Sequence, residues 1–160
     1  MLRKFLFVFA VAASLLSNAQ VATDWDSLKT DITFIVANDN GRNGYYDQRP
    51  IAKTMGEMAE VVEPEAVLAL GDVFHYDGVE SVTDPIWISN YESIYTHPEL
   101  MVNWLPVCGN HEYRGNSQAV IDYSNVSRRW EMPAKYYSRT FKDKNTSINV
   151  ILLDTSPLID

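Results

Sequence analysis

Three short stretches of the chain carry side chains that can bind a metal ion or act on a bound substrate. Each stretch follows an apolar run and contains a glycine or an asparagine. Oxygen donors mixed with imidazole nitrogens suit zinc, manganese and iron, whereas calcium prefers shells made only of oxygen. The side chains therefore point to a zinc, manganese or iron centre. The candidates are Asp39, Asp72, His75, Asn110, His111 and Glu112.

The strength of the signal differs among the three stretches. Asp39 taken alone is as consistent with a turn as with a metal ligand. Asp72 follows the apolar residues 68–70 and Gly71, which favours a ligand placed at the end of a buried strand. The most specific match is the third stretch, residues 109–112. A carboxylate between two cations can bridge them, and two ions about 3.5–4 Å apart can hold a phosphoryl group.

Apolar runs at residues 32–37, 67–70 and 101–107 predict the strands that position these side chains. Between the first two runs, apolar residues at helical spacing predict a helix over residues 48–62. Strand, helix and strand with short connections form a βαβ unit, whose strands are parallel. The carboxyl ends of parallel strands meet at one edge of the sheet, where α/β proteins build their sites.

The rest of the chain predicts further helices and a hairpin. Asp84-Pro85 is typical of a helix start, and the helix expected over residues 86–95 carries an aromatic stripe that favours core packing. Residues 118–130 are predicted to contain a second helical stretch. Two apolar or alternating runs, at 136–141 and 148–153, flank a polar turn and predict a β-hairpin. The order of these elements predicts an α/β fold for the chain as a whole.

The N-terminus and the charge restrict where the protein acts and what it binds. Residues 1–19 have a basic start, a short apolar run and a small-x-small end at Ala19, which predicts a cleavable signal peptide and a secreted or periplasmic product. The apolar run is shorter than the roughly 20 residues of a membrane span. A net charge of −8 disfavours a nucleic-acid partner. Cys108 is the only cysteine, so no intramolecular disulfide forms, and a small buried side chain is expected there.

The donor stretches, in this order along the chain, resemble those of the calcineurin-like metallophosphoesterases. Within that family the sequence is similar to the small, tartrate-resistant type of purple acid phosphatase. The resemblance implies the first half of a four-layer α/β/β/α sandwich, with metal-ligand loops at the C-terminal ends of the strands. The likeness extends beyond the donors to residues 124–130, 132–137 and 151–155.

The resemblance also implies a role for each donor. Asp39 would bind one metal ion, Asp72 would bridge two ions, and Asn110 would bind the second ion. His111 would lie near the substrate and protonate the leaving oxygen or bind the phosphate, while Glu112 would orient its neighbours. The implied cofactors are two metal ions, iron with zinc, manganese or a second iron. The implied reaction is attack of a metal-bound hydroxide on a small phosphate monoester.

Two departures from the family pattern affect this expectation. The family's purple members have a tyrosine ligand where this chain has His75, so either His75 binds metal instead or it is a histidine without that role. The family also takes histidine ligands from its C-terminal half, and none follows His111 here. Residues 20–160 are therefore expected to be the N-terminal part of the domain, with the C-terminal half missing. Phosphatase activity is expected of the parent protein, whereas the 160-residue chain alone is expected to be inactive. The alternatives are a phosphodiesterase or nucleotide hydrolase of the same superfamily, or an inactive, truncated metal-binding chain.

Overall fold

A computed structural model describes residues 25–28, 30 and 32–158 of the chain. The predicted signal peptide, residues 1–19, lies outside the described residues. Among the helices that the structure describes, none has the length and apolar character needed to cross a membrane.

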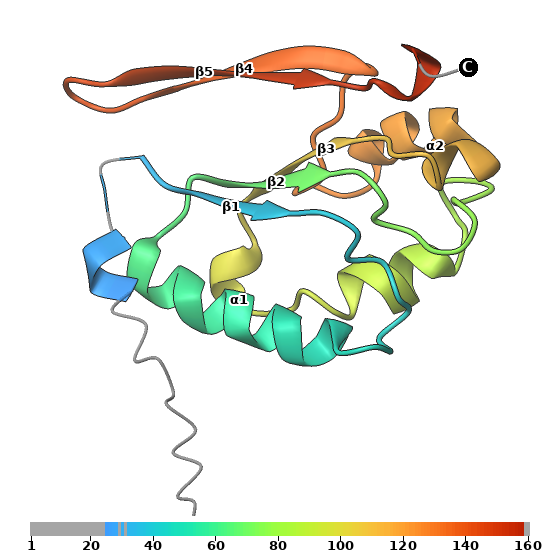
Figure 1. Ribbon diagram of the computed structural model, residues 1–160, viewed down its shortest axis with the longest axis horizontal. Helices are drawn as coiled ribbons and strands as arrows, with labels where there is room; N and C mark the ends of the chain where they lie inside the picture. The colour runs from blue at the N-terminus through green and yellow to red at the C-terminus, as the bar shows by residue number, and fades with distance from the viewer. Residues whose placement is uncertain (1–24, 29, 31, 159–160) are drawn as a thin grey trace, which may run out of the picture.

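A three-stranded parallel sheet forms the centre of the molecule. Its strands are β1 (Phe34–Ala37), β2 (Ala66–Leu70) and β3 (Asn103–Val107), and they lie in the order β1-β2-β3. Helix α1 (Gln48–Val62) connects β1 to β2 and covers one face of the sheet (Figure 1). The predicted βαβ unit is therefore confirmed. Because all three strands are parallel, the loops after Ala37, Leu70 and Val107 leave the sheet at the same edge.

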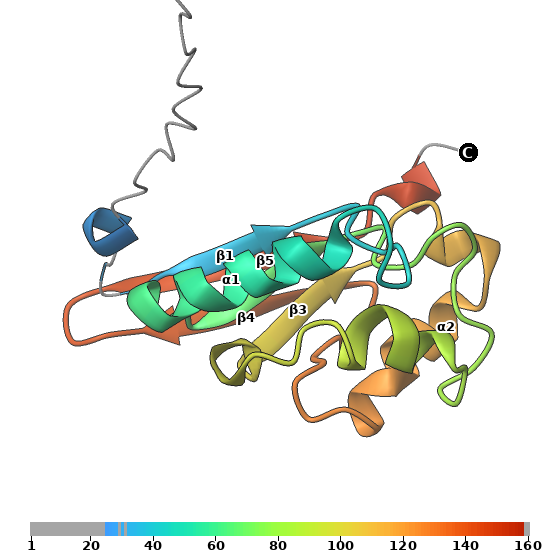
Figure 2. The same cartoon turned by 90° about the horizontal axis from the view of Figure 1, so that it is seen from below.

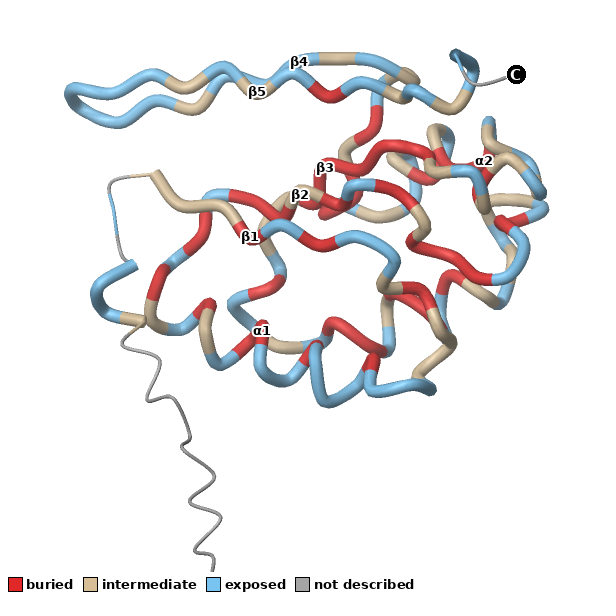
Figure 3. The backbone as a smooth tube through the Cα atoms, viewed as in Figure 1, coloured by how far each residue is buried: buried red, intermediate tan, exposed pale blue. Residues whose placement is uncertain are grey.

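Helix α1 packs on the sheet through one apolar face. Ala52, Met55 and Ala59 are buried at helical spacing, whereas most of the opposite face is exposed (Figure 3). The helix ends at Val62, because Glu63 adopts a left-handed conformation and Pro64 follows it. Its bounds are those that the spacing of apolar residues predicted.

An antiparallel hairpin covers the other face of the sheet. Strands β4 (Tyr136–Lys142) and β5 (Ser147–Leu153) form the hairpin that the alternating pattern predicted. It lies on the side opposite α1, so the layers are helix, parallel sheet and hairpin (Figures 1 and 2). Leu152 packs with Leu105 and Val107 in a small core between the two sheets. This arrangement is consistent with part of a layered α/β sandwich.

The remaining helical segments are shorter than the sequence predicted. Residues 86–92 are helical, with a π-helical turn over Ile88–Glu92, and the helix stops short of residue 95; Asp84 caps its start by accepting from the N–H of Ile86. Helix α2 (Ser117–Asp122) continues as a 3₁₀ turn to Asn125 and then stops. Residues 118–130 thus contain the predicted helical stretch, but only in their first part.

Pairing with β3 explains why the second helix ends early. The backbone N–H of Trp104 donates to the carbonyl of Arg129, and the N–H of Glu131 donates to the carbonyl of Trp104. Residues 129–131 therefore run alongside β3 as an extra extended segment. A tertiary pairing has overridden the local helical pattern.

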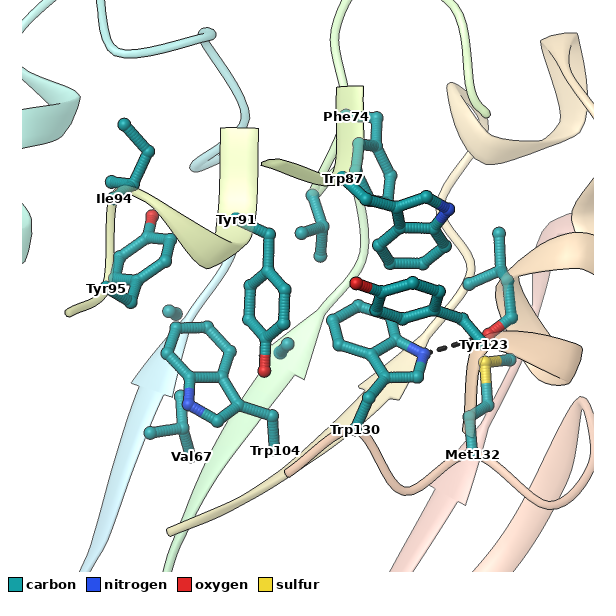
Figure 4. Packing of buried hydrophobic residues seen from close by; sticks show 14 of the residues in the cluster. Val67, Phe74, Trp87, Tyr91, Ile94, Tyr95, Trp104, Tyr123, Trp130 and Met132 are labelled. Carbon is teal, nitrogen blue, oxygen red and sulfur yellow. Dashed lines mark hydrogen bonds between the residues drawn. The ribbon is translucent and has the colours of Figure 1, made fainter. Parts of the chain in front are cut away.

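Aromatic side chains fill the core beneath the sheet (Figure 4). Trp87 stacks on Tyr123 with ring centroids 3.5 Å apart, and Trp130 meets Trp87 edge-on at 5.2 Å. The Trp130 indole donates to the carbonyl of Val120, so its polar atom is satisfied. Tyr91 is also fully buried, which confirms that the aromatic stripe serves core packing.

Candidate metal centre

The loops after β1 and β2, which carry Asp39 and Asp72 and are the first and second donor loops, share an unusual backbone conformation. Asp39 has φ 53° and Asp72 has φ 51°, in the left-handed region that residues other than glycine seldom adopt. The N–H of Asp39 donates to the carbonyl of Gly71 at 3.2 Å, and the N–H of Gly41 donates to the carbonyl of Asp72 at 3.3 Å. The loops are thus bonded to each other. Strained backbone held by its surroundings is a feature of functional sites.

Two glycines allow the second and third loops to approach closely. Gly71 has φ 93°, and a Cβ added there would lie 3.0 Å from the Cα of Gly109. A Cβ on Gly109 would overlap the carboxylate of Asp72. Neither position can therefore hold a larger residue while Asp72 keeps its place.

Glu112 links the second donor loop, which carries Asp72, to the third, which begins at Gly109. Its side chain is 1% exposed and accepts three backbone hydrogen bonds, from Asp72 at 2.9 Å, from Gly109 at 2.7 Å and from Phe74 at 3.1 Å. Burial raises the pKa of the Glu112 carboxyl, and these hydrogen bonds oppose that rise. Glu112 therefore fixes the backbone around Asp72 and does not itself face the site.

Asp72 lies beside both candidate histidines. Asp72 Oδ1 accepts from the backbone N–H of His111 at 3.1 Å, and Asp72 Oδ2 lies 3.9 Å from His75 Nε2. The two imidazole rings have centroids 3.9 Å apart. One potential ligand atom from each of the three side chains lies within 4.8 Å of the others. A single ion could contact all three residues.

The surroundings of the two imidazole rings leave each with a nitrogen that could bind a metal ion. His111 Nδ1 is hydrogen-bonded to the carbonyl of Tyr76, which can only accept, so Nδ1 carries a proton and, in the neutral ring, Nε2 keeps its lone pair. His75 Nδ1 is buried and has no hydrogen-bond partner within the described part of the chain. Burial, followed by the charge of His111, lowers the pKa of His75 and favours the neutral imidazole that a metal requires.

A cleft of about 580 Å³ connects the strand ends to the hairpin. Asp39, Asp72 and Asn110 line it together with residues 150–153 of β5. Asp39 lies outside the cluster of Asp72 and the two histidines, but it lines the same cleft as Asp72 and Asn110. The structure thus brings the predicted site residues to one edge of the sheet, while their individual roles stay predictions.

Sequence reasoning gave no role to Asp154, which connects the hairpin to the site. The Tyr113 hydroxyl donates to Asp154 Oδ2 at 2.7 Å, and Lys135 Nζ donates to the same hydroxyl at 3.0 Å. The available signal was that Asp154 also follows an apolar strand, as Asp72 does.

Cys108, by contrast, is buried as predicted, and burial raises the pKa of its thiol.

Divalent ions should stabilise the protein through His75. At a zinc concentration about 100 times the dissociation constant, binding contributes about 2.7 kcal/mol, which corresponds to roughly 5–10 °C in Tm. We expect His75→Phe, which keeps a ring in the buried position, to lower zinc affinity by about 10-fold or more. Differential scanning fluorimetry with and without zinc measures the shift. His97→Phe removes a histidine outside the site, and this control protein should keep the zinc-induced shift in Tm. An unchanged shift in the His75→Phe protein would exclude His75 as a ligand.

Comparison with known proteins places this site in a family. The family model described as calcineurin-like phosphoesterase matches residues 32–155. Purple acid phosphatase 7 of Arabidopsis thaliana is 33% identical over 129 residues, which cover 81% of this chain and 38% of the relative. Tartrate-resistant acid phosphatase type 5 of Oryctolagus cuniculus is 36% identical over 110 residues, which cover 67% of this chain and 34% of the relative.

A solved structure shows the same fold at lower identity. The structure titled "GAP50 the anchor in the inner membrane complex of Plasmodium" matches with a TM-score of 0.67 and 22% identity, over 78% of this chain and 42% of that one. The chain thus spans between about one third and two fifths of the length of these relatives. With a family match over residues 32–155 and the donor loops at one sheet edge, the chain belongs to the calcineurin-like phosphoesterase family.

Proposed function

We propose that the protein is an exported, metal-dependent phosphatase that hydrolyses small phosphate monoesters. The observation that carries the proposal is the convergence of Asp72, His75 and His111 within 4.8 Å beside a cleft at the strand ends. The names of the relatives, purple and tartrate-resistant acid phosphatases, support the reaction class. The N-terminal sequence supports export.

The chain's own residues would hold and orient the reacting groups. Asp39, His75 and Asn110 would each bind one ion, and Asp72 would lie between two ions. Two bound ions, iron with zinc, manganese or a second iron, would supply charge neutralisation for the phosphate and an acidified water. Glu112 would keep Asp72 in place through its three backbone hydrogen bonds.

His111 is the proposed proton donor to the leaving oxygen. Its Nδ1–H is bonded to the Tyr76 carbonyl, so Nε2 is the nitrogen that would face the leaving oxygen, and it would donate its proton from the doubly protonated ring. We expect His111→Ala to lower kcat by about 10²–10⁴-fold while metal content falls much less. Steady-state kinetics together with elemental analysis measures both quantities. Parallel loss of metal and activity would instead make His111 a metal ligand.

Comparing three substrates would test the reaction class. The protein expressed from its complete gene should hydrolyse para-nitrophenyl phosphate, and chelation should abolish this activity. Preference for bis(para-nitrophenyl) phosphate would favour the phosphodiesterase alternative, and preference for a nucleoside diphosphate would favour a nucleotide hydrolase. Metal binding without turnover of any of the three would contradict the proposal and identify a metal-binding chain.

A further inference from the structure

A second, smaller cleft lies next to the candidate metal centre. It has a volume of about 190 Å³, and its lining includes Asp39, Arg42 and Tyr46. Asp39 also lines the larger cleft at the strand ends. The two clefts therefore meet at a proposed metal ligand, and a substrate held at the metal centre could extend into the smaller one.

Arg42 supplies a positive charge to this cleft. Its side chain is half-buried, and Nη1 donates to the carbonyl of Gly41 at 2.8 Å. Within residues 25–28, 30 and 32–158, Arg42 forms no ion pair. A guanidinium without a carboxylate partner is suited to bind an anionic ligand.

A network of hydrogen bonds holds the backbone around Arg42 in place. Gln48 Oε1 accepts from the backbone N–H of Arg42 at 3.2 Å, and Gln48 Nε2 donates to the carbonyl of Asn90 at 3.0 Å. Asn40 Nδ2 donates to the Tyr95 hydroxyl at 2.7 Å. The backbone that carries Arg42 is thus fixed, whereas Tyr46 at the rim is 76% exposed.

We propose that Arg42 determines substrate specificity by binding a second anionic group, located on the leaving-group part of the phosphate ester. The inference rests on the proposed function, because the metal centre must hold the phosphate that reacts. Arg42 lines only the smaller cleft, whereas Asp72 and Asn110 line only the larger one. The guanidinium is therefore placed for the part of the substrate beyond the reacting phosphate. It also offsets, locally, the repulsion that a chain of net charge −8 exerts on an anion.

Two phosphate esters that differ in one group provide the test. 3-Phosphoglycerate carries a carboxylate where glycerol 3-phosphate carries a hydroxymethyl group. We expect the zinc-loaded protein to bind 3-phosphoglycerate on the order of 10- to 100-fold more tightly, the range for a hydrogen bond to a charged group. Isothermal titration calorimetry measures both affinities without requiring turnover, so a protein that does not hydrolyse esters still tests Arg42.

Three variants separate Arg42 from general charge effects. Arg42→Gln should reduce the preference to less than about 3-fold, while Arg42→Lys should keep part of it. Arg49→Gln removes a nearby exposed charge that does not line the cleft, and it should leave the preference unchanged. Equal affinities in the unmodified protein, or a preference that persists in a folded Arg42→Gln protein, would overturn the proposal. Binding of neither ester would overturn it too, whereas absence of hydrolysis alone would contradict only the proposed function.

Discussion

Replacing Asp72 with asparagine is expected to lower kcat/KM for a phosphate monoester by about 10³-fold. Such a loss corresponds to about 4 kcal/mol, within the several kcal/mol that a bound metal contributes to a transition state. The amide is nearly the same size as the carboxylate and can still accept from the N–H of His111, so the fold should persist. What is lost is the negative charge between the two proposed ions. Steady-state kinetics and elemental analysis of the same preparations measure the effect.

Asp77→Asn is the matched control for this prediction. Asp77 is exposed and lies five positions along the same loop, so its replacement removes one negative charge without touching the cluster. We expect it to change activity less than 2- to 3-fold. An Asp72→Asn protein that keeps both its metal and its turnover would show that Asp72 is not a ligand.

Truncating Glu112 to alanine is expected to lower the free energy of unfolding by about 3 kcal/mol. Three backbone N–H groups would lose a charged acceptor, and each such hydrogen bond is worth about 1.5–3 kcal/mol. The sum is reduced because alanine also removes the cost of burying a carboxylate, the same cost that raises the Glu112 pKa. Urea denaturation followed by fluorescence measures the change.

Two further variants test the cause of this loss. Glu112→Gln keeps the side-chain length but places an amide NH₂ against a backbone donor, so its stability should lie between those of Glu112 and alanine. Glu99→Ala removes an exposed carboxylate and should change stability by less than about 0.5 kcal/mol. A Glu112→Ala protein as stable as the unmodified one would mean that water replaces the carboxylate at the loops.

The parts of the fold with strong local signals could be predicted from the sequence. Helix α1 has one apolar stripe and a proline after it, and its bounds match the prediction. The parallel strands are apolar runs, which place Asp39, Asp72 and Asn110 at one edge by topology alone. For those donors, the location of the site follows from chain order and periodicity.

Other features depend on contacts between distant residues and have no local signature. The helical stretch expected within residues 118–130 stops at Asn125, and residues 129–131 pair with Trp104 instead. Glu112 was expected to orient its neighbours, but its three backbone donors come from two different loops and cannot be derived from spacing. The smaller cleft around Arg42 forms only when the first loop folds against Tyr95.

Metal content and phosphatase activity, measured together through removal and return of metal, test the central claim most directly. The account predicts that the protein expressed from its complete gene contains bound iron, zinc or manganese and hydrolyses para-nitrophenyl phosphate. Chelation should remove both, and adding metal back should restore both, but not in Asp72→Asn. Hydrolysis that continues after complete removal of metal would contradict the account, as would full metal content and activity in the Asp72→Asn protein.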